Sequence, residues 1–169
     1  ANAKIGPAGI APAPNWWFRY LQQRLADAIW EDCSGMVTLV NGVPRHPKKF
    51  VFVLMDNFTM LSCAGAVDAL RIANRLAEAK LYDIVFAGEG GEEARSSSGA
   101  VFRLAMDLEE LNREDTVVLC SGVEVQAATT RRLVNWLRRE ARRGVSIAAL
   151  CTAGHALAKA GLLDGKRAT

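Results

Sequence analysis

The chain has 169 residues, of which 50% are hydrophobic and 23% are charged, and its formal net charge is +3. These values are typical of one globular domain with a core and room for an appended arm, and the charge is too small to indicate nucleic-acid binding by itself. No apolar run reaches the roughly 18–20 residues of a membrane helix, and no signal-peptide pattern opens the chain, so a cytoplasmic protein without membrane contact is predicted.

The cysteines and histidines give little support for a disulfide framework or a zinc site. The four cysteines, at positions 33, 63, 120 and 151, form no CxxC motif, and the chain has only two histidines. Reduced thiols are therefore expected, and we expect neither a metal nor a cofactor.

The first 49 residues are predicted to form an N-terminal arm and linker with one helix. Residues 1–14 are rich in Ala, Gly and Pro, which is typical of a flexible leader. Apolar residues recur every four positions over 16–30, and this period predicts an amphipathic helix that packs on its own domain or on a twin subunit. The sequence leaves open whether residues 1–35 are native or whether Met36 is a natural start.

From residue 50 onward, strand-like apolar runs alternate with helical patterns. Strands are predicted at 50–55, 82–87, 101–104, 116–120 and 145–150, and helices at 59–80, 123–143 and from 153 onward, the first of them capped by Thr59. This alternation predicts an α/β fold with a doubly wound, mainly parallel sheet and helices on both faces. The run 145–150 has the profile of a strand buried on both faces.

The stretch around Cys151 combines a strand, a sharp turn and a helix. Two small residues, Ala149 and Ala153, lie two positions before and two positions after the cysteine, as a nucleophile elbow requires. At a helix N-terminus, unpaired N–H groups and the helix dipole favour a thiolate. Cys151 is therefore the candidate nucleophile, and an inert thiol at a strand end is the alternative.

Candidate binding residues follow three of the predicted strands. They are Asp56, Asn57 and Phe58 after the first strand, Ser121 and Gly122 after the fourth, and Cys151 and Thr152 after the last. Ligands of parallel sheets gather beyond the carboxyl ends of the strands, at the point where the strand order reverses. We therefore predict that these seven residues line a ligand-binding pocket.

Six arginines on the helix predicted at 123–143 suggest nucleic-acid binding at first sight. They are Arg131, Arg132, Arg138, Arg139, Arg142 and Arg143. They fall largely opposite Leu133 and Leu137 and are interrupted by Glu140, so a solvated helix face is the favoured interpretation.

Five motifs together point to a known family. They are Phe58-Thr-Met-Leu61, Val67-Asp-Ala-Leu-Arg-Ile-Ala-Asn74, Ser97-Ser-Gly99, Cys151-Thr-Ala-Gly154 and Ala160-Gly-Leu-Leu-Asp-Gly-Lys-Arg-Ala-Thr169. With them, residues 50–169 resemble the ThiJ/PfpI domain, a class I glutamine amidotransferase-like domain, in the version found at the N-terminus of AraC-type transcriptional regulators. We therefore expect an arm over 1–49 and this domain over 50–169, ending where the family's domain normally continues.

The resemblance implies a flavodoxin-like domain, often a homodimer, with Cys151 at the nucleophile position. It also implies an oxyanion-hole counterpart formed by the loop at Gly122 and the amide of Thr152. In the regulators this pocket is thought to hold a small inducer, and a helix-turn-helix domain, absent from this chain, binds DNA. The resemblance thus predicts a sensing domain for a small polar metabolite around Cys151.

A ThiJ/PfpI-type cysteine enzyme, such as an amidase, peptidase, hydratase or glyoxalase-like protein, is the alternative. Catalytic branches carry a His directly after the cysteine or a Glu early in the first helix, and here these positions hold Thr152 and Ser62. His155, four residues after Cys151, is expected to be an ordinary helix residue. The sequence thus leans against catalysis without deciding it, and a redox role of Cys151 alone stays open.

Overall fold

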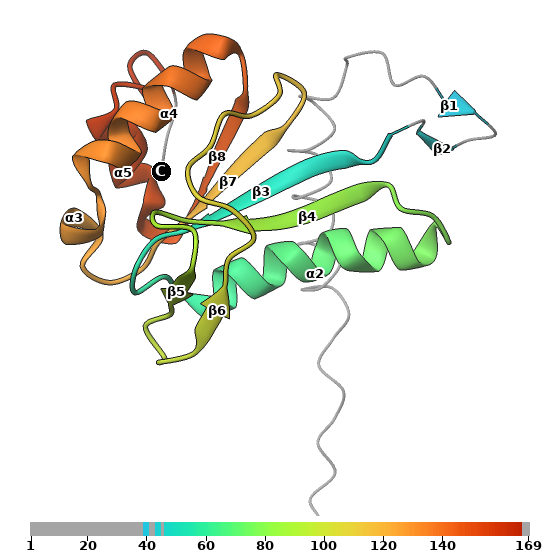
Figure 1. Ribbon diagram of the computed structural model, residues 1–169, viewed down its shortest axis with the longest axis horizontal. Coiled ribbons are helices and arrows are strands. Elements are labelled where there is room, and N and C mark those ends of the chain that lie inside the picture. Colours follow the sequence, from blue (N-terminus) through green and yellow to red (C-terminus); the bar gives the residue numbers. More distant parts are fainter. Residues whose placement is uncertain (1–38, 41–42, 45, 167–169) are drawn as a thin grey trace, which may run out of the picture. The chain divides into compact units, whose positions relative to one another are not determined.

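Four of the predicted strands form one parallel sheet. The computed structural model describes residues 39–40, 43–44 and 46–166, so the predicted leader and arm helix lie outside the described residues. The sheet holds β3 (Lys48–Leu54), β4 (Tyr82–Ala87), β7 (Thr116–Cys120) and β8 (Ser146–Leu150) in the order β4-β3-β7-β8 (Figure 1). All pairings within it are parallel, which confirms the predicted α/β fold class.

Different helices cover the two faces of this sheet (Figure 1). The helix α2 (Met60–Leu76) lies on one face, and α4 (Arg131–Arg143) lies with the short α5 (Gly154–Lys159) on the other. Successive strand residues point to opposite faces, so Val51 and Val53 of β3 join a core with Leu137 of α4. Phe52 points to the opposite face and packs against Phe86 of β4, with ring centroids 6.1 Å apart.

Two antiparallel strand pairs lie outside the main sheet. β1 (Leu39–Val40) pairs with β2 (Val43–Pro44), and β5 (Glu93–Arg95) pairs with β6 (Val101–Arg103). The strand predicted at 101–104 is therefore one arm of a hairpin. No helix in the described part of the chain has the length and apolar character needed to cross a membrane.

The helix predicted at 123–143 is in fact two helices, α3 (Val125–Ala128) and α4. The break falls before α4 because the side chain of Thr130 accepts a hydrogen bond from the nitrogen of Leu133 at 3.0 Å and caps the new helix. At the other end, Gly144 closes α4 with a φ of 87°, a conformation that glycine adopts readily. Apolar periodicity continues across the break and therefore hides it in the sequence.

β8 is less buried than its apolar sequence predicts. Among the described strands it is an edge strand, and Ala148 is exposed. Ile147 and Ala149 still pack against the core on the face of α4 and α5. The prediction of burial on both faces is therefore wrong, because an apolar run identifies a strand but not the number of its neighbours.

Leu137→Ala is expected to destabilise the domain strongly, because Leu137 is fully buried between α4 and the sheet. Removing a buried leucine side chain typically costs about 2–5 kcal/mol of unfolding free energy. Leu61→Ala is the matched control, since Leu61 is 83% exposed on α2, and it should change this free energy by less than about 0.5 kcal/mol. Urea denaturation followed by circular dichroism measures both, and equal losses would contradict this core.

Candidate functional site

The loops after β3, β7 and β8 each contain a non-glycine residue with positive φ. The angle is 58° at Asn57, 58° at Glu124 and 55° at Cys151. A left-handed backbone costs such a residue about 1–3 kcal/mol, and residues of this kind concentrate at functional sites. All three loops leave the carboxyl edge of the sheet, so this edge is the candidate site.

Gly122 lies directly against the loop that follows β3. A Cβ atom on Gly122 would collide with the carbonyl oxygen of Asn57 and lie 2.8 Å from the nitrogen of Thr59. The close approach lets Gly122 pair with Phe58 in an antiparallel bridge, and the nitrogen of Thr59 donates to the carbonyl oxygen of Ser121 at 3.2 Å. Gly122 is therefore required for the loops after β3 and β7 to meet.

Cys151 occupies a tight turn between β8 and α5. A short 3-10 turn, η1 (Cys151–Ala153), follows the strand directly, and α5 continues from it. The hydroxyl of Thr152 donates to the carbonyl oxygen of Gly122 at 2.6 Å and ties this turn to the loop after β7. The Cys151 side chain is exposed, and its sulfur lies 3.5 Å from the hydroxyl oxygen of Thr59. The loops after β3, β7 and β8 therefore meet around Cys151 and Thr152.

The polar neighbour of the Cys151 sulfur is a hydroxyl group. The sulfur is hydrogen-bonded to the Thr59 hydroxyl, which can donate or accept this bond but cannot act as a general base at neutral pH. In the described part of the chain, no hydrogen bond joins a carboxylate or imidazole to this sulfur. His155 is exposed on α5, and Ser62 donates to the carbonyl oxygen of Thr59 at 3.0 Å.

Two of the predicted site residues point into the interior instead of toward a ligand. Phe58 is fully buried and packs edge-to-face on Phe102, with ring centroids 5.3 Å apart. Its predicted place on the pocket surface is corrected accordingly, because a large apolar ring is most stable in the core. Ser121 is also fully buried, and its hydroxyl has no hydrogen-bond partner among the described residues.

Asp56 borders a separate cavity of about 210 Å³ at the end of β3. Glu89 and Glu93 supply the other acidic groups of its lining, and Glu89 accepts a hydrogen bond from the Thr130 hydroxyl at 2.5 Å. Cys151 does not line this cavity. The predicted residues therefore divide between two neighbouring places on the strand-end edge.

Sequence reasoning missed Thr59 and Glu124 as site residues. Thr59 was expected to cap α2, but its side chain makes no capping hydrogen bond and turns to Cys151 instead. Glu124 accepts a hydrogen bond from the side chain of Asn57 at 3.1 Å, which links the loops after β3 and β7. Their position beside the predicted residues Phe58 and Gly122 is the one signal the sequence offers for them.

The other two described cysteines, Cys63 and Cys120, are buried. A hydrogen bond with Cys63 and burial together raise the pKa of the Cys120 thiol far above its ordinary value. A thiol that stays protonated is a poor nucleophile. Cys63 is shielded from solvent by burial, so of the three described cysteines Cys151 is the one expected to react with reagents in solution.

Comparison with known sequences identifies relatives of this domain. A family model described as the DJ-1/PfpI family matches residues 48–169. The HTH-type transcriptional regulator GbdR of Pseudomonas aeruginosa is 39% identical over 133 residues, which cover 77% of this chain and 36% of that protein. The HTH-type transcriptional regulator GlxA of Rhizobium meliloti is 39% identical over 124 residues, which cover 72% and 38%. The chain thus spans little more than a third of the length of these regulators.

Solved structures share the fold. An AraC family transcriptional regulator from Pseudomonas putida matches with a TM-score of 0.61 and 25% identity, over 71% of this chain and 64% of that one. A DJ-1 superfamily protein from Agrobacterium tumefaciens matches with a TM-score of 0.55 and 23% identity, over 69% and 60%. Both agree with the parallel sheet and its two helical layers.

Gly122→Ala is expected to destabilise the domain by more than about 2 kcal/mol, because its Cβ would collide with the carbonyl oxygen of Asn57. Gly65→Ala is the matched control. It lies within α2, and no atom beyond the neighbouring backbone of its own helix is within 4 Å of the new Cβ, so this substitution should stabilise the domain by up to about 1 kcal/mol. Chemical denaturation measures both changes, and a neutral Gly122→Ala would contradict the close loop contact.

Brief treatment of the native protein with a maleimide should label Cys151 and spare Cys63 and Cys120. The first is exposed and the other two are buried, so the latter should react only after unfolding. Peptide mapping by mass spectrometry assigns the labelled positions. Labelling of Cys63 or Cys120 at the rate of Cys151 would show that the interior opens more easily than this structure implies.

Proposed function

The chain belongs to the DJ-1/PfpI family, and we propose that it is the ligand-sensing domain of an AraC-type transcriptional regulator. GbdR and GlxA, two of its curated relatives, are HTH-type transcriptional regulators, and it matches a little more than a third of their length. In this proposal the domain binds a small polar metabolite as an inducer, in the cytoplasm and as a homodimer. A separate helix-turn-helix domain binds DNA.

The exposed sulfur of Cys151 at the meeting of three loops is the observation that carries the proposal. A ligand that touches Cys151 and Thr152 also acts on Gly122, because the Thr152 hydroxyl is bonded to the carbonyl oxygen of that glycine. The binding free energy of such a ligand therefore acts on the loops after β7 and β8 together. A ligand shifts an equilibrium between two conformations by the difference in its affinity for them. In this proposal the two conformations differ in the arrangement of these loops, so the ligand binds one of them more tightly.

A ThiJ/PfpI-type cysteine enzyme is the second candidate, favoured by the exposed thiol and left-handed backbone of Cys151. Such an enzyme needs a carboxylate or imidazole within hydrogen-bond reach of the sulfur. Here the sulfur is bonded to the hydroxyl of Thr59. This contact favours the sensor, in which the thiol forms part of a binding surface.

A thermal-shift screen with small polar metabolites tests the sensor. A true ligand at 100 times its Kd should stabilise the protein by about 2.7 kcal/mol, which raises the Tm by roughly 5–10 °C. Cys151→Trp should abolish this shift, because the indole would fill the space beside Thr59. Leu76→Trp is the matched control on an exposed position of α2 and should keep it.

Two results would count against the sensor. One is a ligand whose shift survives Cys151→Trp unchanged, which would place its site elsewhere. The other is steady turnover of an amide, ester or aldehyde substrate that is lost in Cys151→Ser, which would establish the enzyme instead.

A further inference from the structure

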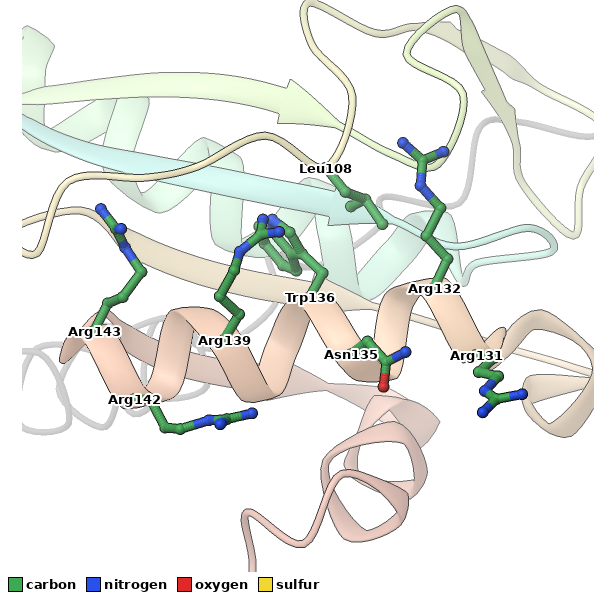
Figure 2. A pocket seen from close by; sticks show the side chains of 8 residues that line it. All are labelled: Leu108, Arg131, Arg132, Asn135, Trp136, Arg139, Arg142 and Arg143. Atoms are coloured by element: carbon green, nitrogen blue, oxygen red, sulfur yellow. The ribbon is translucent and has the colours of Figure 1, made fainter.

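An open groove runs along α4, and five arginines surround it (Figure 2). It encloses about 950 Å³, and its lining includes Arg131, Arg132, Arg139, Arg142 and Arg143 with Trp136 among them. We call it the arginine groove. All five arginines are exposed, as the predicted solvated face requires, but they gather around one hollow. Figure 2 shows Arg132, Arg139 and Arg143 rising toward the loop of Leu108, while Arg131 and Arg142 point away from it.

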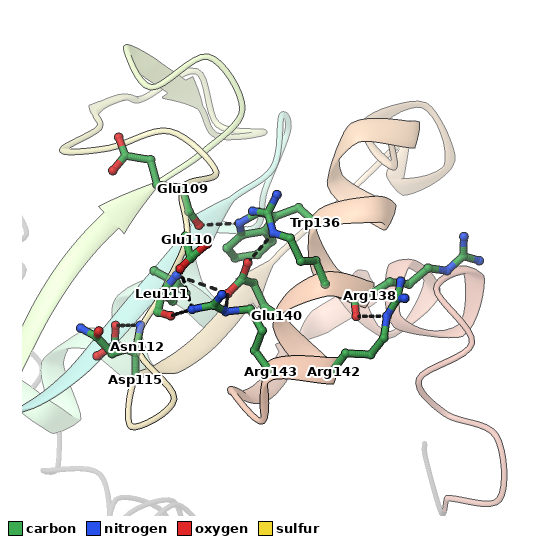
Figure 3. A network of polar contacts seen from close by, with 11 residues as sticks. Glu109, Glu110, Leu111, Asn112, Asp115, Trp136, Arg138, Glu140, Arg142 and Arg143 are labelled. Atoms are coloured by element: carbon green, nitrogen blue, oxygen red, sulfur yellow. Dashed lines mark hydrogen bonds and ion pairs between the residues drawn. The ribbon is translucent and has the colours of Figure 1, made fainter.

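The floor of the arginine groove is held in place by hydrogen bonds (Figure 3). The indole of Trp136 is 3% exposed and donates to the carbonyl oxygen of Glu109 at 2.6 Å. Glu140 is fully buried and accepts hydrogen bonds from the nitrogen of Leu111 at 3.2 Å and from Nε of Arg139 at 2.8 Å. These bonds fix the loop after β6 to α4, so the groove is formed before any ligand binds.

Three arginines of the groove have carboxylate partners. Arg132 lies 2.8 Å from Asp107, and its hydrogen bond lowers the pKa of that carboxyl below the ordinary value. Arg143 lies 2.7 Å from Glu110. Arg139 is bonded to Glu140, as described above. Carboxylates therefore offset three of the five guanidinium charges.

Arg131 and Arg142 keep their positive charge uncompensated. Within the described residues neither forms an ion pair with a carboxylate, and Nε of Arg142 donates to the carbonyl oxygen of Arg138 at 3.2 Å. A bond to a carbonyl oxygen orients a guanidinium group but leaves its charge in place. The two residues lie 142 − 131 = 11 positions apart on α4, so their Cα atoms are about 16 Å apart along the helix axis.

We propose that the arginine groove binds the phosphate backbone of double-stranded DNA. Guanidinium groups bond phosphate oxygens with two parallel hydrogen bonds, and a span of about 16 Å corresponds to about five nucleotides of one strand. Contacts of this kind release counterions from the DNA, so binding is independent of base sequence and weakens steeply with salt.

The surface chemistry favours DNA over an acidic protein. Protein interfaces depend on apolar anchors buried at their centre. In the described part of the chain, the exposed large hydrophobic residues are Met60, Leu61, Leu76, Val101 and Val123, and none lies on α4. Trp136 is buried, and its N–H is already bonded to a backbone carbonyl. A phosphate backbone needs mainly charge and hydrogen-bond donors, which this groove supplies.

This inference goes beyond the sensing role and does not depend on any ligand at Cys151. A regulator that holds DNA through its helix-turn-helix domain would gain a second, sequence-independent contact to the same duplex. Such a second contact acts at a high effective concentration and can add affinity even when it is weak alone. Because the arginine groove lies on this domain, the 169-residue chain should bind DNA by itself.

Fluorescence anisotropy with a labelled duplex of random sequence, about 20 base pairs long, tests the proposal on the 169-residue chain. We expect binding in the micromolar range at 50 mM NaCl that is largely lost at 200 mM. The double variant Arg131→Gln/Arg142→Gln should bind at least tenfold more weakly and lower the slope of log Kd against log salt by about two. Within residues 46–166 neither arginine pairs with a carboxylate, so the variant should keep the parent's Tm.

Arg71→Gln/Arg75→Gln removes the same charge from α2, on the other face of the sheet, and should bind within twofold of the parent. The lysine variant Arg131→Lys/Arg142→Lys should keep most of the affinity, which separates loss of charge from loss of fold. Absence of binding at 50 mM NaCl, or equal losses in the two glutamine variants, would overturn the proposal. So would displacement of the duplex by polyglutamate as effectively as by unlabelled DNA of equal charge, because an acidic protein would then fit the groove as well.

Discussion

The contact between Gly122 and the backbone around Asn57 is the constraint on which the strand-end surface depends. β3 and β7 are neighbours in the sheet, and the chain leaves them toward different helices. Because Gly122 has no side chain, the two loops approach within hydrogen-bonding distance. Thr152, in the turn after β8, bonds to the same glycine. Gly122 is not among the glycines with positive φ, so the space it leaves matters here and its conformational freedom does not.

This contact also positions the polar neighbour of the Cys151 sulfur. The hydroxyl of Thr59 lies against Gly122 and turns to the sulfur, so α2 begins without a side-chain cap. The helix gives up about 1 kcal/mol of capping energy, and the left-handed residues of the three loops cost about 1–3 kcal/mol each. The net stability of a domain is only about 5–15 kcal/mol, so a well-packed core is needed to offset these costs. The apolar residues on both faces of the sheet provide that core.

The sequence predicts the sheet well and the site only in part. Apolar runs and their alternation with helical patterns depend on local burial, so the parallel strands and the turn at Cys151 could be predicted. The break before α4 was missed because the apolar period continues across it, whereas the hydrogen bond from the Leu133 nitrogen to the Thr130 hydroxyl starts a new helix there. Phe58 was misplaced because its position after a strand does not reveal which way its ring points, and the ring packs on Phe102. Thr59 was missed because its contact with Cys151 spans 92 residues of sequence.

Thr130 joins the cavity beside Asp56 to the arginine groove. Its hydroxyl accepts the hydrogen bond that caps α4, from the nitrogen of Leu133, and donates one to Glu89 in the cavity beside Asp56. A charged acceptor strengthens the hydroxyl's dipole and so the cap itself. A ligand that drew Glu89 away would weaken the start of α4 by a fraction of the roughly 1 kcal/mol that such a cap contributes. The first residue of that helix is Arg131, so the Thr130 hydroxyl links the cavity beside Asp56 to the start of the arginine groove.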